Sequence, residues 1–97
     1  MATFFMFGKY SLESVKEINP ERTTKAKSII EALGGKVLGM YAILGDYDLV
    51  LIVELPGLDE AVRTSVDLHI LTGIHFTTSP ALPVEYFDIL ISKGRTI

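Results

Sequence analysis

Two carboxylates in the middle of the chain, Asp48 and Glu54, are of the type that performs general acid and base chemistry. They flank an apolar run and fall on the same face of an extended strand. Six residues at about 3.3 Å each separate them by roughly 20 Å, whereas cooperating carboxylates stand about 5 to 9.5 Å apart. They therefore cannot form a catalytic pair within one chain. We expect Asp48 to end a turn and Glu54 to be a rim charge or part of an interface salt bridge.

The other reactive side chains are also isolated from one another. His69 and His75 lack the close helical spacing and the third ligand of a zinc site, so no metal site is predicted. Ser65 and Asp67 flank one residue of a helix and point apart, which excludes a local nucleophile and base. Gly34-Gly35 follows a helix, where a phosphate-binding loop would precede one. These residues predict no cofactor and no known reaction.

The composition is that of one small domain, residues 1–97, with an excess of apolar residues. A net charge of −3 without a Lys/Arg cluster argues against nucleic-acid binding. Charges, Gly or Pro break every apolar run, which argues against a membrane span, and the first residues do not form a signal peptide. The absence of cysteine fits a cytoplasmic protein. A hydrophobic fraction of 48% and a mean hydropathy of +0.38 suggest that a partner covers apolar surface.

The hydrophobic periodicity predicts the elements that would position these side chains. Extended runs are predicted at residues 3–9, 36–44, 47–55 and 74–79, and helical spacing occurs at residues 11–18, 20–33 and 58–71. Asn19 and Pro20 provide the cap and first position of the second helix, and Gly73 ends the third. Within residues 83–93, the apolar residues of segment 84–91 fit a strand or a helix, and we expect a short helix after Pro83.

The order of the main elements is strand, helix, strand, strand, helix, strand. This order predicts an α+β, ferredoxin-like βαββαβ fold with a four-stranded antiparallel sheet and two helices on one face. Gly45-Asp46 between the two central runs suits a two-residue type II′ hairpin turn.

A short motif in this hairpin resembles a known family. Leu44-Gly45-Asp46-Tyr47-Asp48, with an apolar strand behind it and Leu33-Gly34-Gly35-Lys36 ahead, is similar to the GYD domain family, which is named for its Gly-x-Tyr-Asp turn. Pro20-Glu21-Arg22 also resembles that family's helix start. The resemblance implies a fold of the dimeric α-β barrel superfamily, whose members include small monooxygenases, lactone isomerases and regulatory ligand-binding domains. It implies no particular reaction.

The predicted turn divides the central hairpin into two faces. It places Ile43 opposite Asp48, Tyr41 opposite Val50, Gly39 opposite Ile52 and Val37 opposite Glu54 on one face. The other face, with Leu38, Met40, Ala42, Leu49, Leu51, Val53 and Leu55, belongs under the helices. The first face has an apolar centre and a polar rim, as interfaces do. We therefore expect a sheet-to-sheet homodimer, or a ring of dimers, through Phe5, Phe7, Tyr41, Val50 and Ile52.

Three functions are compatible with this sequence. The first is a small-molecule binding or sensing domain that takes a small apolar or aromatic ligand in a cavity between sheet and helices, lined by Phe7, Tyr41 and Tyr86. The second, by analogy with the superfamily, is a cofactor-free enzyme in which Tyr41, Asp48 or His75 handles a proton. The third is a structural protein that only oligomerises. The few polar groups favour binding over catalysis.

Overall fold

Four antiparallel strands form one sheet in the order β2-β3-β1-β4. In the computed structural model, which describes residues 1–93, strand β1 spans Ala2–Lys9, β2 spans Lys36–Ala42, β3 spans Leu49–Leu55 and β4 spans His75–Ala81. Strand β1 pairs with both β3 and β4, so the first strand lies in the centre of the sheet. The predicted α+β fold with a four-stranded antiparallel sheet is confirmed.

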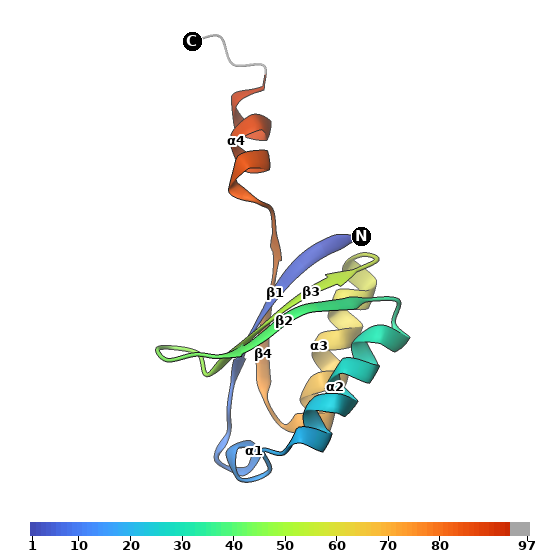
Figure 1. Ribbon diagram of the computed structural model, residues 1–97, viewed down its shortest axis with the longest axis vertical. Helices are drawn as coiled ribbons and strands as arrows, with labels where there is room; N and C mark the ends of the chain where they lie inside the picture. The colour runs from blue at the N-terminus through green and yellow to red at the C-terminus, as the bar shows by residue number, and fades with distance from the viewer. Residues whose placement is uncertain (94–97) are drawn as a thin grey trace.

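The helices lie mainly on one side of this sheet. Helix α2 (Pro20–Ala32) and helix α3 (Leu58–Thr72) pack side by side against the same face (Figure 1). The short helix α1 (Leu12–Lys16) lies at one end of this layer, and α4 (Val84–Ser92) extends away from the opposite end (Figure 1). The C-terminal segment is therefore a helix, as expected. None of the helices in residues 1–93 combines the length and the apolar character needed to cross a bilayer.

The helix boundaries follow from local capping chemistry. The Asn19 side chain accepts a hydrogen bond of 2.8 Å from the Arg22 N–H, and Pro20 occupies the first helical position of α2. Helix α1 begins with a capping box between Ser11 and Ser14. Helix α3 ends at Gly73, whose φ of +72° lies in the left-handed region that glycine adopts readily. These caps fix the direction in which each helix leaves its loop.

The core fills the space between the sheet and the helix pair. In β1 the alternation of side chains buries Phe4 and Met6 and leaves Phe5 and Phe7 on the other face, as predicted. The apolar side chains of the main cluster come from β1, β3, α2 and α3: Phe4, Met6, Ala26, Ile30, Leu51, Val53, Leu55, Ala61 and Leu68.

The register between β2 and β3 differs from the prediction at one end. Tyr41 pairs with Val50 and Gly39 with Ile52 as expected, but Val37 pairs with Val53 instead of Glu54. A bulge at residue 38 inserts one extra residue into β2. Beyond the bulge, Val37 packs against the core and Leu38 is 49% exposed, so the predicted faces of these two residues are exchanged.

The connection between β2 and β3 is longer than a two-residue turn. Strand β2 ends at Ala42 and β3 begins at Leu49, which leaves residues 43–48 as a loop. The Ile43 N–H donates to the Asp48 carbonyl oxygen (2.9 Å), while the Asp48 N–H donates to the Gly8 carbonyl oxygen (2.8 Å) in β1. The prediction of a type II′ turn was wrong because Asp48 bonds to the neighbouring strand, which no local turn rule includes.

Candidate functional site

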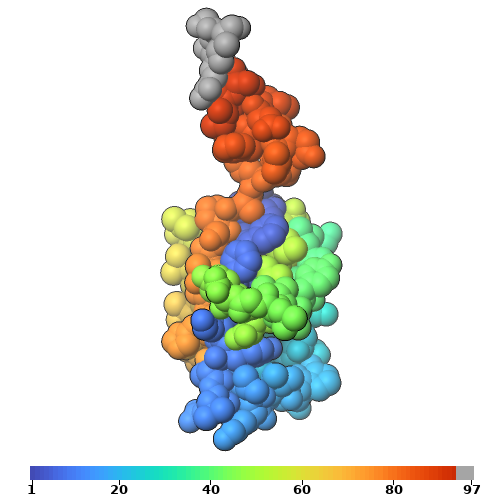
Figure 2. All heavy atoms as spheres, turned by 90° about the vertical axis from the view of Figure 1, so that its left-hand side faces the viewer, coloured from blue at the N-terminus to red at the C-terminus, as the bar shows by residue number. Residues whose placement is uncertain are grey.

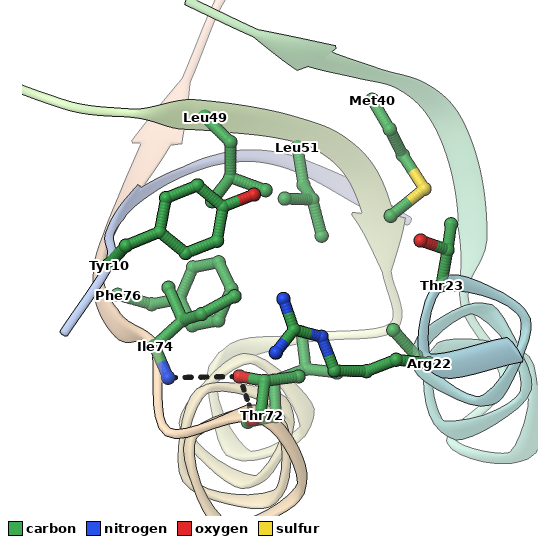
Figure 3. A pocket seen from close by; sticks show the side chains of 11 residues that line it. Tyr10, Arg22, Thr23, Met40, Leu49, Leu51, Thr72, Ile74 and Phe76 are labelled. Carbon is green, nitrogen blue, oxygen red and sulfur yellow. Dashed lines mark hydrogen bonds between the residues drawn. The ribbon is translucent and has the colours of Figure 1, made fainter. Parts of the chain in front are cut away.

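A pocket opens between the sheet and helices α2 and α3, and Figure 3 shows its lining side chains. Its free volume is about 50 Å³, which is room for roughly three to five water molecules. Polar side chains reach it from the end of β1 and from both helices: Tyr10, Arg22, Thr23 and Thr72. Most of its wall is apolar and comprises Met40, Leu49, Leu51, Leu68, Ile74 and Phe76.

Arg22 is the charged group of this pocket. Its side chain reaches from α2 across the pocket toward Ile74 and Thr72 (Figure 3). One guanidinium nitrogen donates to the Ser14 carbonyl oxygen (2.8 Å), which ties the side chain to the middle of α1. The ion pairs in residues 1–93 join Lys25 to Glu21 and Arg63 to Asp67. No carboxylate in these residues lies within salt-bridge distance of Arg22. The pocket thus holds a cation without a charged partner in the described chain.

Three hydroxyl groups accompany this arginine. The Thr72 hydroxyl has no donor left for a ligand, since it donates to the Leu68 carbonyl oxygen (2.7 Å) and also accepts from the Ile74 N–H (3.0 Å). Tyr10 is positioned through its backbone, whose N–H donates to the Asp48 carboxylate (2.8 Å). Within residues 1–93 the hydroxyls of Tyr10 and Thr23 make no hydrogen bond to the protein, so both are free to bind a ligand.

The side chains proposed as proton carriers are not assembled into one site. Tyr41 lies on the sheet face opposite the pocket, where it is 59% exposed. Asp48 holds the Tyr10 backbone. His75 lies at the start of β4 with its ring centroid 4.4 Å from that of His69, whose Nδ1 hydrogen-bonds the Ile74 carbonyl oxygen (2.8 Å). No hydrogen bond in the described chain links Tyr41, Asp48 and His75 to one another.

The aromatics expected to line a cavity between sheet and helices occupy other places. Phe7 and Tyr41 lie on the outer face of the sheet, and Phe7 packs against Tyr47 with ring centroids 5.2 Å apart. Tyr86 lies on α4 and is 52% exposed. The cavity on the helix side is lined by Tyr10 and Phe76 in their place. Among residues 1–93 no group of three or more His, Asp or Glu side chains is arranged to hold a metal ion.

Comparison with known proteins identifies the family. The family model that describes the GYD domain matches residues 4–91. The chain belongs to the GYD domain family. A search of curated proteins finds no match to this GYD domain.

Solved structures share the fold of this GYD domain. The leucine response regulatory protein LrpA of Mycobacterium tuberculosis superposes with a TM-score of 0.56 at 12% identity, over 84% of this chain and 51% of that chain. A crystal structure of a glutamate-to-alanine mutant gives a TM-score of 0.56 at 13% identity, over 84% and 50%. The GYD domain therefore spans about half the length of each of these structures.

The second face of the GYD-domain sheet has no helix across it in residues 1–93. Figure 2 views this face and shows β1 (blue) between β4 (orange) and the β2-β3 hairpin (green). Cross-strand rows place Tyr41 beside Val50 and Phe7, and Gly39 beside Ile52 and Phe5. The five residues predicted to form an interface thus lie together on one face: Phe5, Phe7, Tyr41, Val50 and Ile52.

Sequence reasoning missed the polar residues of the pocket. Arg22 was noted only as part of the Pro20-Glu21-Arg22 helix start, and Tyr10 and Thr23 were not singled out. One signal was available. A positive charge in the first turn of a helix interacts unfavourably with the positive end of the helix dipole, so an arginine at this position suggests a role other than helix stability.

Proposed function

We propose that this GYD domain is a small-molecule binding or sensing domain that acts as a homo-oligomer. The pocket between the sheet and the helix pair carries the proposal. It combines an apolar wall with a few convergent polar groups, among them the Arg22 guanidinium and the free hydroxyl of Tyr10. This is the usual composition of a small-ligand site.

The uncovered face of the sheet supports assembly of two chains sheet to sheet. Its centre is apolar, with Phe5, Phe7 and Ile52, and its ends carry Lys9 and Glu54. Full burial of an exposed large apolar side chain contributes roughly 1.5–3 kcal/mol, and the partly buried Phe5, Phe7 and Ile52 would gain the share that corresponds to their remaining exposure. A domain is stable by only about 5–15 kcal/mol. An identical face that covers it would therefore stabilise the dimer by a free energy that is appreciable beside the stability of one domain. A homodimer would bury this face in a contact between two sheets, and a ring of dimers would keep the same contact.

Helix α4 supports the same conclusion from another part of the chain. It follows β4 and projects away from the body formed by the sheet and the other helices (Figures 1 and 2). Its apolar side chains are between 44% and 68% exposed: Val84, Tyr86, Phe87, Ile89, Leu90 and Ile91. An amphipathic or apolar helix of this kind is stabilised by packing rather than by propensity. A second copy of the chain brings its own sheet and its own α4. It could therefore cover these apolar side chains without a different protein.

The fold likeness is an analogy in favour of sensing. The Mycobacterium tuberculosis structure is named as a leucine response regulatory protein, and its matched half has the same fold as this GYD domain. Fold alone does not carry function, so the analogy adds to the pocket and does not replace it. The cofactor-free enzyme has less support, because Tyr41, Asp48 and His75 lie apart.

Native mass spectrometry of the full chain purified from its host tests this proposal. We expect a homo-oligomer whose mass exceeds that of the bare chains by a bound small molecule, which denaturation releases for identification. Thermal-shift measurements with a panel of small metabolites provide the second readout. A bare monomer whose melting temperature no compound raises would contradict both the binding role and the assembly.

A further inference from the structure

We propose that the Arg22 pocket binds a small monocarboxylate with a short aliphatic tail. This inference rests on the proposed function, because it assumes that the GYD domain takes its ligand in this pocket. It names the chemical class that the Arg22, Tyr10 and Thr23 side chains would recognise.

The charge of the pocket determines the sign of the ligand. A guanidinium carries five N–H donors, and in the described chain the Arg22 group gives one hydrogen bond, to the Ser14 carbonyl oxygen. The carbonyl neutralises no charge, and no carboxylate lines the pocket. A cation partly removed from water without a partner is unfavourable, whereas a planar carboxylate can accept two parallel N–H bonds from it. An anionic group on the ligand therefore supplies what the protein lacks here.

The hydroxyls add to this recognition. Figure 3 shows Tyr10 and Thr23 on two sides of the pocket, from the end of β1 and from α2. Since both hydroxyls are free of protein hydrogen bonds in residues 1–93, each has a donor available for a carboxylate oxygen. The Thr72 hydroxyl has none, because its hydrogen already goes to the Leu68 carbonyl oxygen.

The walls determine the rest of the ligand. Leu49, Leu51 and Phe76 present apolar surface beside the arginine, which suits a hydrocarbon tail. The free volume of about 50 Å³ limits the enclosed part of the ligand to a few heavy atoms, which favours a short, compact tail. Arg22 is the single cation among the lining residues, so a second negative charge, as on a phosphate, would lack a partner. A monoanion of small size fits these limits best.

Heteronuclear NMR titration of the full-length, nitrogen-15-labelled chain tests this assignment with isobutyrate as the probe and isobutyramide as its neutral isostere. We expect isobutyrate to shift the Arg22 Nε–Hε resonance and the amides around Ile74, and to bind about tenfold to a hundredfold more tightly than isobutyramide, the range for hydrogen bonds to a charged group. Arg22→Met should abolish this preference. The matched control is Arg63→Met, which removes an exposed arginine of α3 that is ion-paired to Asp67 and should change neither affinity.

The outcomes separate the two levels of the proposal. Equal binding of isobutyrate and isobutyramide in the pocket, or tighter binding of inorganic phosphate, would overturn the carboxylate assignment and leave the binding function intact. Binding of neither organic probe, together with no retained small molecule in native mass spectrometry, would overturn both. If Arg22→Met does not fold, Arg22→Lys keeps the charge without the planar fork, and a weakened preference for isobutyrate in that variant carries the test.

Discussion

Tyr41 lies on the uncovered face of the sheet and exposes 59% of its surface, so Tyr41→Ala probes the sheet-to-sheet assembly directly. The side chain packs over Gly39, where an added Cβ would come 2.9 Å from the Tyr41 ring. It contributes nothing to the buried core between sheet and helices. Its replacement should therefore weaken the dimer far more than it weakens the single chain.

The magnitude follows from the exposed area. A tyrosine buries roughly 150–250 Å², so the exposed 59% corresponds to roughly 90–150 Å², or about 2–4 kcal/mol at about 25 cal/mol per Å². The hydroxyl and incomplete coverage reduce this to about half, or about 1–2 kcal/mol per chain. A symmetric dimer contains the residue twice, so the dimer dissociation constant should rise by roughly 30-fold to several hundredfold.

Sedimentation equilibrium over a concentration series measures this constant. Ile70→Ala is the matched control, because Ile70 is 75% exposed on α3, in the layer on the opposite side of the sheet. It should leave the dissociation constant unchanged. A wild-type chain that is monomeric at about 10 µM, far above the nanomolar range typical of stable complexes, would refute the assembly. An equal effect of both substitutions would refute the choice of face.

Three further substitutions test the fold that carries the pocket. Thr64→Val should raise the free energy of unfolding by about 1 kcal/mol in urea denaturation, because the Thr64 hydroxyl is buried without a hydrogen-bond partner in residues 1–93; a loss of stability would show that it has one. Gly35→Ala should lower that free energy by about 1–3 kcal/mol, since its Cβ would lie 2.5 Å from Leu55 and 2.8 Å from the Glu54 carbonyl oxygen. Gly57→Ala is the control, because the nearest atom to its added Cβ is 3.5 Å away, and its free energy of unfolding should stay within about 1 kcal/mol of the wild type. Asp48→Ala should reduce the melting temperature and lower the free energy of unfolding by about 1–3 kcal/mol, because it removes the acceptor of the Tyr10 N–H. Asp48→Asn keeps an acceptor oxygen and should recover part of that loss.

The elements could be predicted from sequence because their signals are local. The alternation in β1 assigns Phe4 and Met6 to one face, and Asn19-Pro20 marks the start of α2. The bulge in β2 could not be predicted in this way. One extra residue leaves the apolar pattern nearly unchanged, since Val37 and Leu38 are both apolar and either can face the core.

The pocket depends on contacts that a linear pattern does not contain. Tyr10 reaches it because Asp48, 38 residues away, accepts a hydrogen bond from the Tyr10 backbone. Arg22 reaches it because the Ser14 carbonyl holds its guanidinium. Each of these groups is an ordinary surface residue by type and spacing. Their meeting follows from the packing of α2 against the sheet, which is a tertiary property.

The two outer strands of the sheet determine how copies of this chain can add to one another. A free strand edge is a template for further strands and for open-ended growth. At one edge the bulge in β2 interrupts the ladder of backbone groups, and at the other β4 contains Pro80, which has no N–H to donate. Both edges are therefore poor templates. In the proposed assembly, association through the broad face ends after one partner has bound, so this architecture would favour closed assemblies over filaments.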